Sequence, residues 1–384
     1  MREPGRTAIG TWSGGRFMHF GEPVSEQRLA ALLRPGEIDT VITADVYGEG
    51  EADRLLGQAI EGVARESFSL VGAVGHDFYE AGRDGPRGYP RFTDPALRAP
   101  GEYADYLRMA TERSLERIGA ERFDLLFLHN PDRSGYQSET VWDGMEMLRE
   151  AGLTDQLGVA PGPANGFTLD LIWNLERFGE RIDWAMIILN PLEPWPGELC
   201  LDAAVRNGVK VITRVVDYGG LFWDDLDPGA ELPRSDHRSF RPEGWIEAGR
   251  EKLERLRPIA SAAGLTPMQL ACQWNLAHPA VSCAVPTLIQ ERGATARPIE
   301  DKRSELEQLP EQRLEPQQVE QIREIGDNTG SMALKGANPE HEGEERPDRW
   351  ALSAELAEVA ERWEIDPRRD LAGAPAAAPA RNRG

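Results

Sequence analysis

The chain has 384 residues, of which 40% are hydrophobic and 28% charged, a composition typical of a globular protein with a substantial core. Its 43 Lys and Arg residues against 65 Asp and Glu residues give a formal net charge of −22, which repels nucleic acids and anionic membranes and excludes both as expected partners. This charge does not attract an anionic substrate from a distance either, so any anion site has to be local.

Short apolar segments rich in Val, Ile and Leu alternate with longer amphipathic segments along most of the chain. Such short segments predict strands that are buried on both faces of a parallel sheet. The predicted strands are residues 7–11, 40–44, Ser69–Val74, 125–129, 157–160, 185–190, 209–216 and Val281–Val285.

The longer segments carry apolar residues at helical spacing. The predicted helices are residues 50–63, Tyr103–Ile118, 139–151, Thr168–Phe178, 198–207, Trp245–Ala263 and 267–277. Eight strands that alternate with helices predict an α/β fold, a (β/α)₈ TIM barrel, with the functional site in the loops that follow the strands. The alternative, an open doubly wound sheet, lacks its G-x-G-x-x-G signature after the first strand.

Two long segments interrupt the alternation, residues 76–99 after the third strand and 224–242 after the seventh. Loops of this length in a compact domain are usually functional or disordered, and both follow strands on the same barrel face. We therefore expect them to cover a site.

The pattern changes near residue 330. We expect a barrel over residues 1–330, a C-terminal extension over 331–371 with one helix at 350–363, and a disordered tail over 372–384. The absence of a signal peptide and of any membrane-length apolar segment predicts a cytoplasmic protein.

No metal site is predicted. Cys200, Cys272 and Cys283 are spaced too widely for a disulfide framework or a zinc motif, and two of them fall in apolar runs typical of a core. His76, His129 and Asp45 follow strands but have no recognisable ligand spacing.

Four motifs, in order along residues 7–330, resemble the aldo-keto reductases. They are GTW at residues 10–12, ITADVYGEGEADRLLGQAI at 42–60, LLFLHNPD at 125–132 and LTPMQLACQWNLAHPAVSCAVP at 265–286. The resemblance implies a barrel oxidoreductase that transfers a hydride between NADP(H) and a carbonyl. It also implies that Tyr47 handles the proton and that His129 orients the substrate.

The resemblance also identifies positions where this chain departs from the family. The aspartate and lysine that assist the family's tyrosine align with Ile42 and Ala73. Losing both partners of a buried ion pair is compatible with a stable fold, whereas losing one would leave a buried charge without its partner. Without a nearby cation, Tyr47 should keep a pKa near or above about 10.

The implied cofactor positions differ as well. The carboxamide-binding glutamine aligns with Met186, the aromatic residue that stacks on the nicotinamide aligns with Arg214, and Asn190 is kept as a cofactor contact. The I-P-G loop that begins phosphate binding in the family reads V-P-T at residues 285–287. NADP is therefore the implied cofactor, at an atypical nicotinamide site.

Arg214 follows a buried strand, which predicts that its guanidinium lies at the barrel mouth. It either pairs with Asp217 or Asp45, or it binds an anionic or polyhydroxylated ligand. The other predicted substrate contacts also lie at or just past strand ends: Trp12, Asp45, His76, Asp217 and Tyr218.

Three functions remain open at this point, and fold alone does not choose among them. The first is an aldo-keto-reductase-like oxidoreductase that acts on a carbonyl or sugar-like small molecule. The second is a cofactor-independent lyase, isomerase or epimerase that uses Tyr47 and His129 for proton transfer. The third is a non-catalytic binding protein on the same fold.

Overall fold

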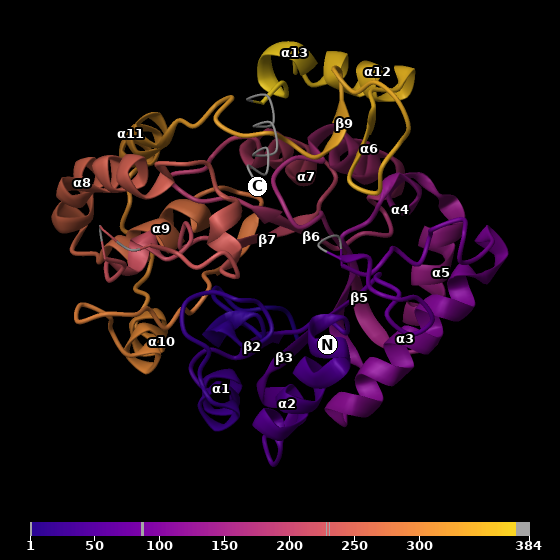
Figure 1. The fold of residues 1–384 in the computed structure, drawn as a ribbon, viewed down its shortest axis with the longest axis horizontal. Helices are drawn as coiled ribbons and strands as arrows, with labels where there is room; N and C mark the ends of the chain where they lie inside the picture. Colours follow the sequence, from indigo (N-terminus) through magenta and orange to yellow (C-terminus); the bar gives the residue numbers. More distant parts are fainter. Residues whose placement is uncertain (1, 86–87, 228, 230, 374–384) are drawn as a thin grey trace, which may run out of the picture.

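The computed structural model describes residues 2–85, 88–227, 229 and 231–373. Its centre is an eight-stranded parallel sheet in the strand order β1 to β8 (Figure 1). A bridge between Thr7 and Ala284 joins β8 to the start of the chain and closes the barrel. The strands are β1 Ile9–Gly10, β2 Thr40–Ile42, β3 Ser69–Val74, β4 Phe123–His129, β5 Thr154–Ala160, β6 Trp184–Ile188, β7 Lys210–Arg214 and β8 Val281–Val285. The predicted TIM barrel is confirmed.

Helices surround the barrel (Figure 1). They are α1 Glu26–Leu33, α2 Glu51–Ile60, α3 Tyr103–Ile118, α4 Arg133–Gln137, α5 Glu139–Glu150, α6 Thr168–Phe178, α7 Leu201–Arg206, α8 Trp245–Ala263, α9 Pro267–Leu276, α10 Ile299–Glu307, α11 Pro316–Gly326, α12 Ala354–Arg362 and α13 Pro367–Asp370. Three of the predicted helices have the predicted bounds, namely α3, α6 and α8. Three helices of eight or more residues were not predicted: α1, α10 and α11.

Alternation along the strands divides the apolar residues into two buried clusters. The larger one lies between the sheet and the helices. The smaller one fills the barrel and includes Ile42, Ala73, Phe127, Trp184 and Met186. All three cysteines are free and buried.

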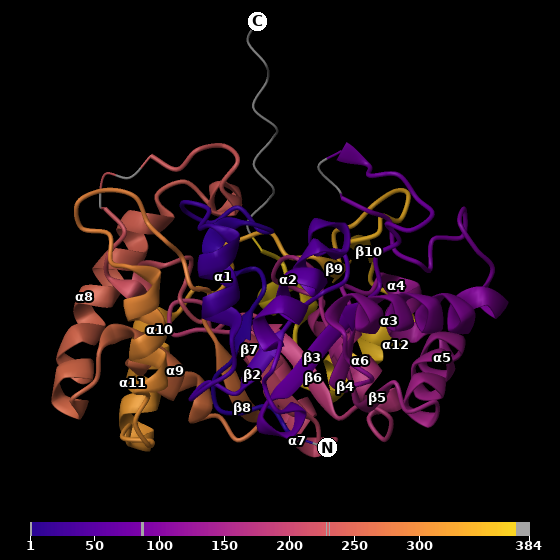
Figure 2. The ribbon, with the colours of Figure 1, turned by 90° about the horizontal axis from the view of Figure 1, so that it is seen from below.

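The two long loops rise from the same edge of the barrel (Figure 2). The described residues of 76–99 form no α-helix or β-strand element, and an antiparallel bridge between His76 and Arg91 folds this loop back on itself. In the described residues of 224–242, His237–Phe240 form a 3₁₀ helix. This arrangement confirms the prediction of long loops after the third and seventh strands.

The C-terminal extension packs against α6 and contains more structure than the one helix that we expected. Strands β9 Gly336–Asn338 and β10 Arg349–Ala351 form a parallel ribbon, and α12 and α13 follow. The helix expected at 350–363 begins later: Trp350 lies on β10, and α12 begins only after Ser353, whose side chain accepts a hydrogen bond from Leu356 N. The tail predicted to be disordered falls almost entirely outside the described residues.

No helix in the described part of the chain has the length and apolar character needed to cross a membrane.

Candidate active site

Four aromatic side chains predicted from the sequence meet at the ends of β1 to β4. The rings of Tyr47 and His129 are perpendicular, with centroids 5.8 Å apart. Trp12 meets Tyr47 edge-on at 6.5 Å, and His76 meets His129 at 5.2 Å. We call this group, together with Arg214, the mouth cluster.

Apolar side chains lie beneath Tyr47. Ile42 and Ala73 are 2% and 8% exposed and belong to the cluster inside the barrel, against which Tyr47 packs. Burial raises the pKa of Tyr47, and the Arg214 charge offsets part of that increase. Tyr47 is therefore a neutral phenol near pH 7, able to donate a hydrogen bond.

His129, the last residue of β4, is a buried neutral imidazole. Burial, followed by the charges of Arg91 and Arg214, lowers its pKa to about 3. Its Nδ1 is buried and has no hydrogen-bond partner among the described residues. The next residue, Asn130, has a φ of 49°, which turns the chain away immediately after the strand. His129 is thus left with a ring nitrogen available to a ligand.

His76, unlike His129, has a hydrogen-bond partner at each ring nitrogen. Its Nε2 accepts from Asn130 Nδ2 at 3.0 Å, so its Nδ1 carries the proton and donates to Tyr89 O at 3.0 Å. Burial and the charge of Arg91 lower its pKa well below the usual range. His76 is therefore a neutral neighbour of His129 whose ring nitrogens are already engaged.

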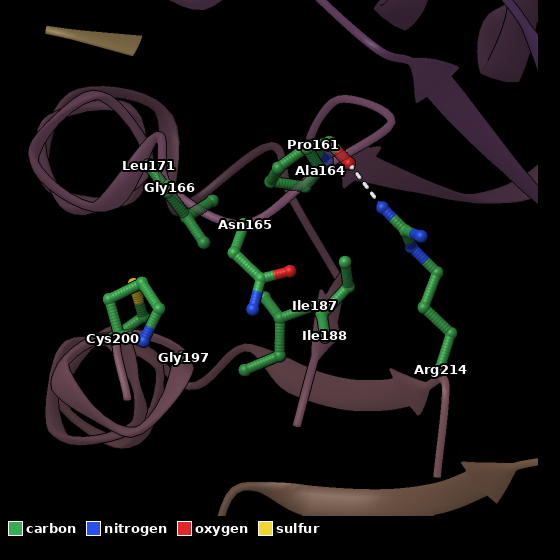
Figure 3. A pocket seen from close by; sticks show the side chains of 11 residues that line it. Pro161, Ala164, Asn165, Gly166, Leu171, Ile187, Ile188, Gly197, Cys200 and Arg214 are labelled. Atoms are coloured by element: carbon green, nitrogen blue, oxygen red, sulfur yellow. Dashed lines mark hydrogen bonds between the residues drawn. The ribbon is translucent and has the colours of Figure 1, made fainter. Parts of the chain in front are cut away.

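Arg214, the last residue of β7, reaches across the mouth to the loop after β5 (Figure 3). Its Nη2 donates to Pro161 O at 3.1 Å and to Gly162 O at 2.7 Å. Val215 then adopts a φ of 60°, which is rare for a β-branched residue, and its carbonyl accepts from Asn190 Nδ2 at 3.0 Å. No carboxylate lies within ion-pair distance of Arg214 in the described part of the chain.

A narrow cavity lies beside Arg214 (Figure 3). Its walls are the loop after β5, the end of β6 and the turn before α7, and the side chain of Asn165 points into it. Asn165 Nδ2 is buried without a hydrogen-bond partner among the described residues. The sequence analysis did not identify Asn165, although its place in a loop after a strand was a usable signal.

Asp45 does not join the mouth cluster. Its carboxylate accepts from Tyr79 OH at 3.2 Å, and Arg117 on α3 donates to the same hydroxyl at 2.7 Å. Burial and the nearby Asp53 raise the pKa of Asp45 well above its usual range. Asp45 therefore faces the loop of residues 76–99 and α3.

Three further residues that were predicted to contact the cofactor or the substrate interact with other residues of the protein instead. Asn190 Nδ2 donates to Glu193 Oε2 at 3.1 Å as well as to Val215 O. Asp217 accepts from Thr287 N at 2.7 Å and from Gly220 N at 2.8 Å. The ring of Tyr218 lies under the Arg241 guanidinium at 4.3 Å and beside Trp245 at 5.7 Å, and burial raises its pKa to about 12.

Arg91 was also missed by the sequence analysis. It is 7% exposed, donates from Nε to Asn130 O and places Nη1 3.2 Å from His76 Nδ1. The signal was its position in the long loop of residues 76–99, a segment predicted to cover a site. Arg91 therefore adds a second guanidinium beside the mouth cluster.

In the described ranges, no group of three or more His, Cys, Asp or Glu side chains is arranged to hold a metal ion. The functional groups at the mouth are the neutral rings of Tyr47 and His129 and the guanidiniums of Arg214 and Arg91.

Comparisons with known proteins agree with this architecture. A 6-dehydroglucose reductase of Novosphingobium aromaticivorans is 26% identical over 284 residues, which cover 70% of this chain and 78% of that protein. The glycerol dehydrogenase structure from Gluconobacter oxydans superposes with a TM-score of 0.63 at 22% identity, covering 85% of this chain and 94% of the other.

A third likeness is to an aldo/keto reductase of Klebsiella pneumoniae in complex with NADP and acetate, with a TM-score of 0.54 at 21% identity over 83% of this chain and 90% of that one. At these identities the two solved structures establish the fold alone. The sequence model of the aldo/keto reductase family matches residues 8–325, which is most of the chain. This chain is a member of the aldo/keto reductase family.

Proposed function

We propose that this protein acts on the carbonyl group of a sugar-like small molecule at the mouth cluster, and that it does not hold NADP(H) in the manner of its family. The observation that carries the proposal is the perpendicular contact of the Tyr47 and His129 rings, close enough to Arg214 for its positive charge to lower the pKa of both. The similarity to a 6-dehydroglucose reductase supports a sugar-like substrate.

The mouth supplies hydrogen-bond donors for a carbonyl oxygen. Tyr47 is a neutral phenol, and neutral His129 has a free buried Nδ1. Such donors stabilise negative charge that develops on oxygen, and they are most effective where a fixed cation and apolar walls replace water. Arg214 supplies that cation, and the apolar group of Ile42 and Ala73 forms the floor. The arrangement suits any reaction that passes through an oxyanion.

The nicotinamide end of an NADP molecule does not fit the residues present. By resemblance, Arg214 occupies the position of the ring that stacks on the nicotinamide, yet its guanidinium is bonded to Pro161 O and Gly162 O. The amide hydrogens of Asn190, implied to contact the carboxamide, are donated to Glu193 and Val215.

The phosphate end does not fit either. The loop after β8, where phosphate binding begins in the family, donates Thr287 N to Asp217, which also accepts from Gly220 N. Farther along that loop, buried Glu291 forms an ion pair with Arg238. Carboxylates of the chain itself therefore take these donors, which a phosphate would need. We assign no reaction step to the nicotinamide.

This misfit favours a second candidate, a cofactor-independent lyase, isomerase or epimerase. In that case the free Nδ1 of neutral His129 would take a proton from the carbon next to the carbonyl and return it in the product, while Tyr47 donates a hydrogen bond to the carbonyl oxygen. Arg214 would stabilise the resulting enediolate charge. The same three side chains serve both candidates, so the experiment has to separate them by the presence or absence of cofactor.

The test is to incubate the protein with a panel of aldoses, ketoses and dehydro-sugars in D₂O, with and without NADPH, and to follow the products by NMR. A reductase gives an alcohol only with NADPH. An isomerase or epimerase incorporates deuterium without it. Tyr47→Phe and His129→Ala should each abolish the turnover found, while the Tm stays nearly unchanged.

Tyr89→Phe is the matched control, because it removes a phenol hydroxyl that binds Glu49 outside the mouth cluster. It should keep wild-type activity. Full activity in both the Tyr47 and His129 variants would refute the assignment of the mouth. Binding of a sugar without turnover under either condition would leave the non-catalytic binding protein as the function.

A further inference from the structure

Buried cations in this protein are paired with carboxylates. Arg98 binds Asp77 at 2.7 Å, and both side chains are at most 5% exposed. The fully buried Lys302 binds Asp225 at 2.7 Å. Arg238, 2% exposed, forms ion pairs with Asp236 and Glu291. This is the expected arrangement, because an unpaired buried charge costs several kcal/mol.

Arg91, which is 7% exposed, and the half-buried Arg214 have no such carboxylate partner in the described chain. Arg91 donates to Asn130 O and contacts His76, and Arg214 donates to Pro161 O and Gly162 O. Over residues 2–85, 88–227, 229 and 231–373, neither guanidinium has a carboxylate within ion-pair distance. Burial lowers the pKa of both groups, which nevertheless remain charged at neutral pH.

Both arginines lie near His129. Arg91 contacts His76, whose ring centroid is 5.2 Å from that of His129. Arg214 approaches from β7 and acts on both Tyr47 and His129. The donor pair proposed to bind the carbonyl thus lies near two positive charges, neither of which has a carboxylate within ion-pair distance in the described protein, although Asp132 and Asp348 act on Arg91 from farther away.

Each guanidinium keeps hydrogen-bond donors for a ligand. Arg214 uses only Nη2, so its Nε and Nη1 make no hydrogen bond within the described chain. Arg91 donates from Nε to Asn130 O, its Nη1 lies 3.2 Å from His76 Nδ1, and its Nη2 makes no hydrogen bond within the described chain. The nearby Nδ1 of His129 is buried and has no partner among the described residues. Unused guanidinium donors near an unpartnered imidazole nitrogen are suited to binding an anion.

From this arrangement we infer that the substrate is itself an anion: a sugar-sized carbonyl compound with a carboxylate or phosphate group, which Arg91 and Arg214 neutralise beside His129. The inference rests on the proposed function for the location of the site and adds the charge of the substrate. It also explains how a chain with a net charge of −22 can bind an anion, because the attraction is local.

The test measures binding by calorimetry with three probes: D-glucuronate, D-glucose 6-phosphate and the neutral D-glucuronamide. The wild-type protein should bind at least one acid about tenfold or more tightly than the amide. The acid that binds more tightly identifies the anionic group. Arg214→Met and Arg91→Met should each remove that selectivity, so that the acid binds no more tightly than the amide does.

Arg108→Met is the matched control, since Arg108 is an exposed arginine on α3 that pairs with Glu112; it should keep the selectivity. Rising NaCl concentration should weaken binding of the acids to the wild-type protein and leave binding of the amide unaffected, a measurement that requires no variant to fold. Equal binding of acid and amide, no binding of either acid, or selectivity that survives in both variants would overturn the inference. Selectivity that is lost in the arginine variants, combined with full activity of Tyr47→Phe and His129→Ala, would instead refute the proposed function alone.

Discussion

His129 and Tyr47 are both neutral in the folded protein, for the same physical reason. Burial in a mouth with an apolar floor disfavours their charged forms, and two adjacent guanidiniums oppose protonation of the imidazole. Ile42 and Ala73, at the positions that the resemblance implies for the family's aspartate and lysine, are packed in the apolar cluster inside the barrel, so neither position leaves a charge buried alone. Among the described residues, the mouth cluster offers hydrogen-bond donors and the weakly basic imidazole of His129.

The low pKa of His129 predicts a pH dependence of stability. An exposed histidine takes up its proton near pH 6.5, whereas folded His129 does so only near pH 3. Between these values the unfolded chain binds more protons, so the free energy of unfolding falls as the pH falls through this window. The His129 contribution has a slope of about 1.4 kcal/mol per pH unit within the window.

Urea unfolding of the wild type and of His129→Gln at several pH values between 4 and 7 measures this slope. The variant should lose less stability on acidification than the wild type does. Parallel curves for the two proteins would show that His129 is not a buried neutral imidazole.

The sequence predicted the members of the mouth cluster because they follow strands, and strand ends of a closed barrel converge. The sequence did not show that Asp45 and Asp217 lie outside the mouth cluster, because position along the chain does not reveal which donors a carboxylate binds. Asp217 accepts from the main-chain amides of Thr287 and Gly220, and Asp45 accepts from the Tyr79 hydroxyl. Arg91 was missed for the complementary reason, since it comes from a loop whose fold has no periodic signal.

Elements that bury a continuous apolar face were predicted well. Strands β3 and β8 and helices α3, α6 and α8 have the expected bounds. Helix α10 was missed because it buries only Ile299, Lys302 and Leu306, too few for a visible apolar stripe. The ribbon β9–β10 was missed because its strands have only three residues each and are held by contacts with distant parts of the chain.

The C-terminal extension depends on one buried carboxylate of α6. Asp170 accepts from Ala337 N at 2.9 Å and from the indole Nε1 of Trp350 at 3.0 Å. Asp170→Ala would leave both donors buried without a partner and should lower the free energy of unfolding by about 2–3 kcal/mol. Limited proteolysis should then cleave the 331–371 segment before the barrel.

Asp202→Ala, at an exposed aspartate on the neighbouring helix α7, is the control and should leave stability unchanged. A variant of Asp170 with wild-type stability and wild-type proteolysis would show that the extension is held by its apolar contacts alone.

At the scale of the whole molecule, the net charge of the chain and the charge at the mouth have opposite signs. The chain carries 22 more acidic than basic residues, yet the mouth holds two arginines that have no carboxylate within ion-pair distance in the described protein. In the loops after β7 and β8, buried carboxylates do take up hydrogen-bond donors. Asp217 accepts from Thr287 N, and Glu291 pairs with Arg238, in the region that the resemblance implies for phosphate binding. This distribution favours a small anion at the mouth and disfavours a dinucleotide stretched across the barrel face.

The most direct test of this account is calorimetric titration of the purified protein with NADPH and with NADH. Because Asp217, Glu291 and Arg214 hold internal partners at the positions that the resemblance implies for phosphate and nicotinamide, we predict no saturable binding of either nucleotide in the low-micromolar range. Saturable binding of NADPH with a low-micromolar Kd would contradict the proposal.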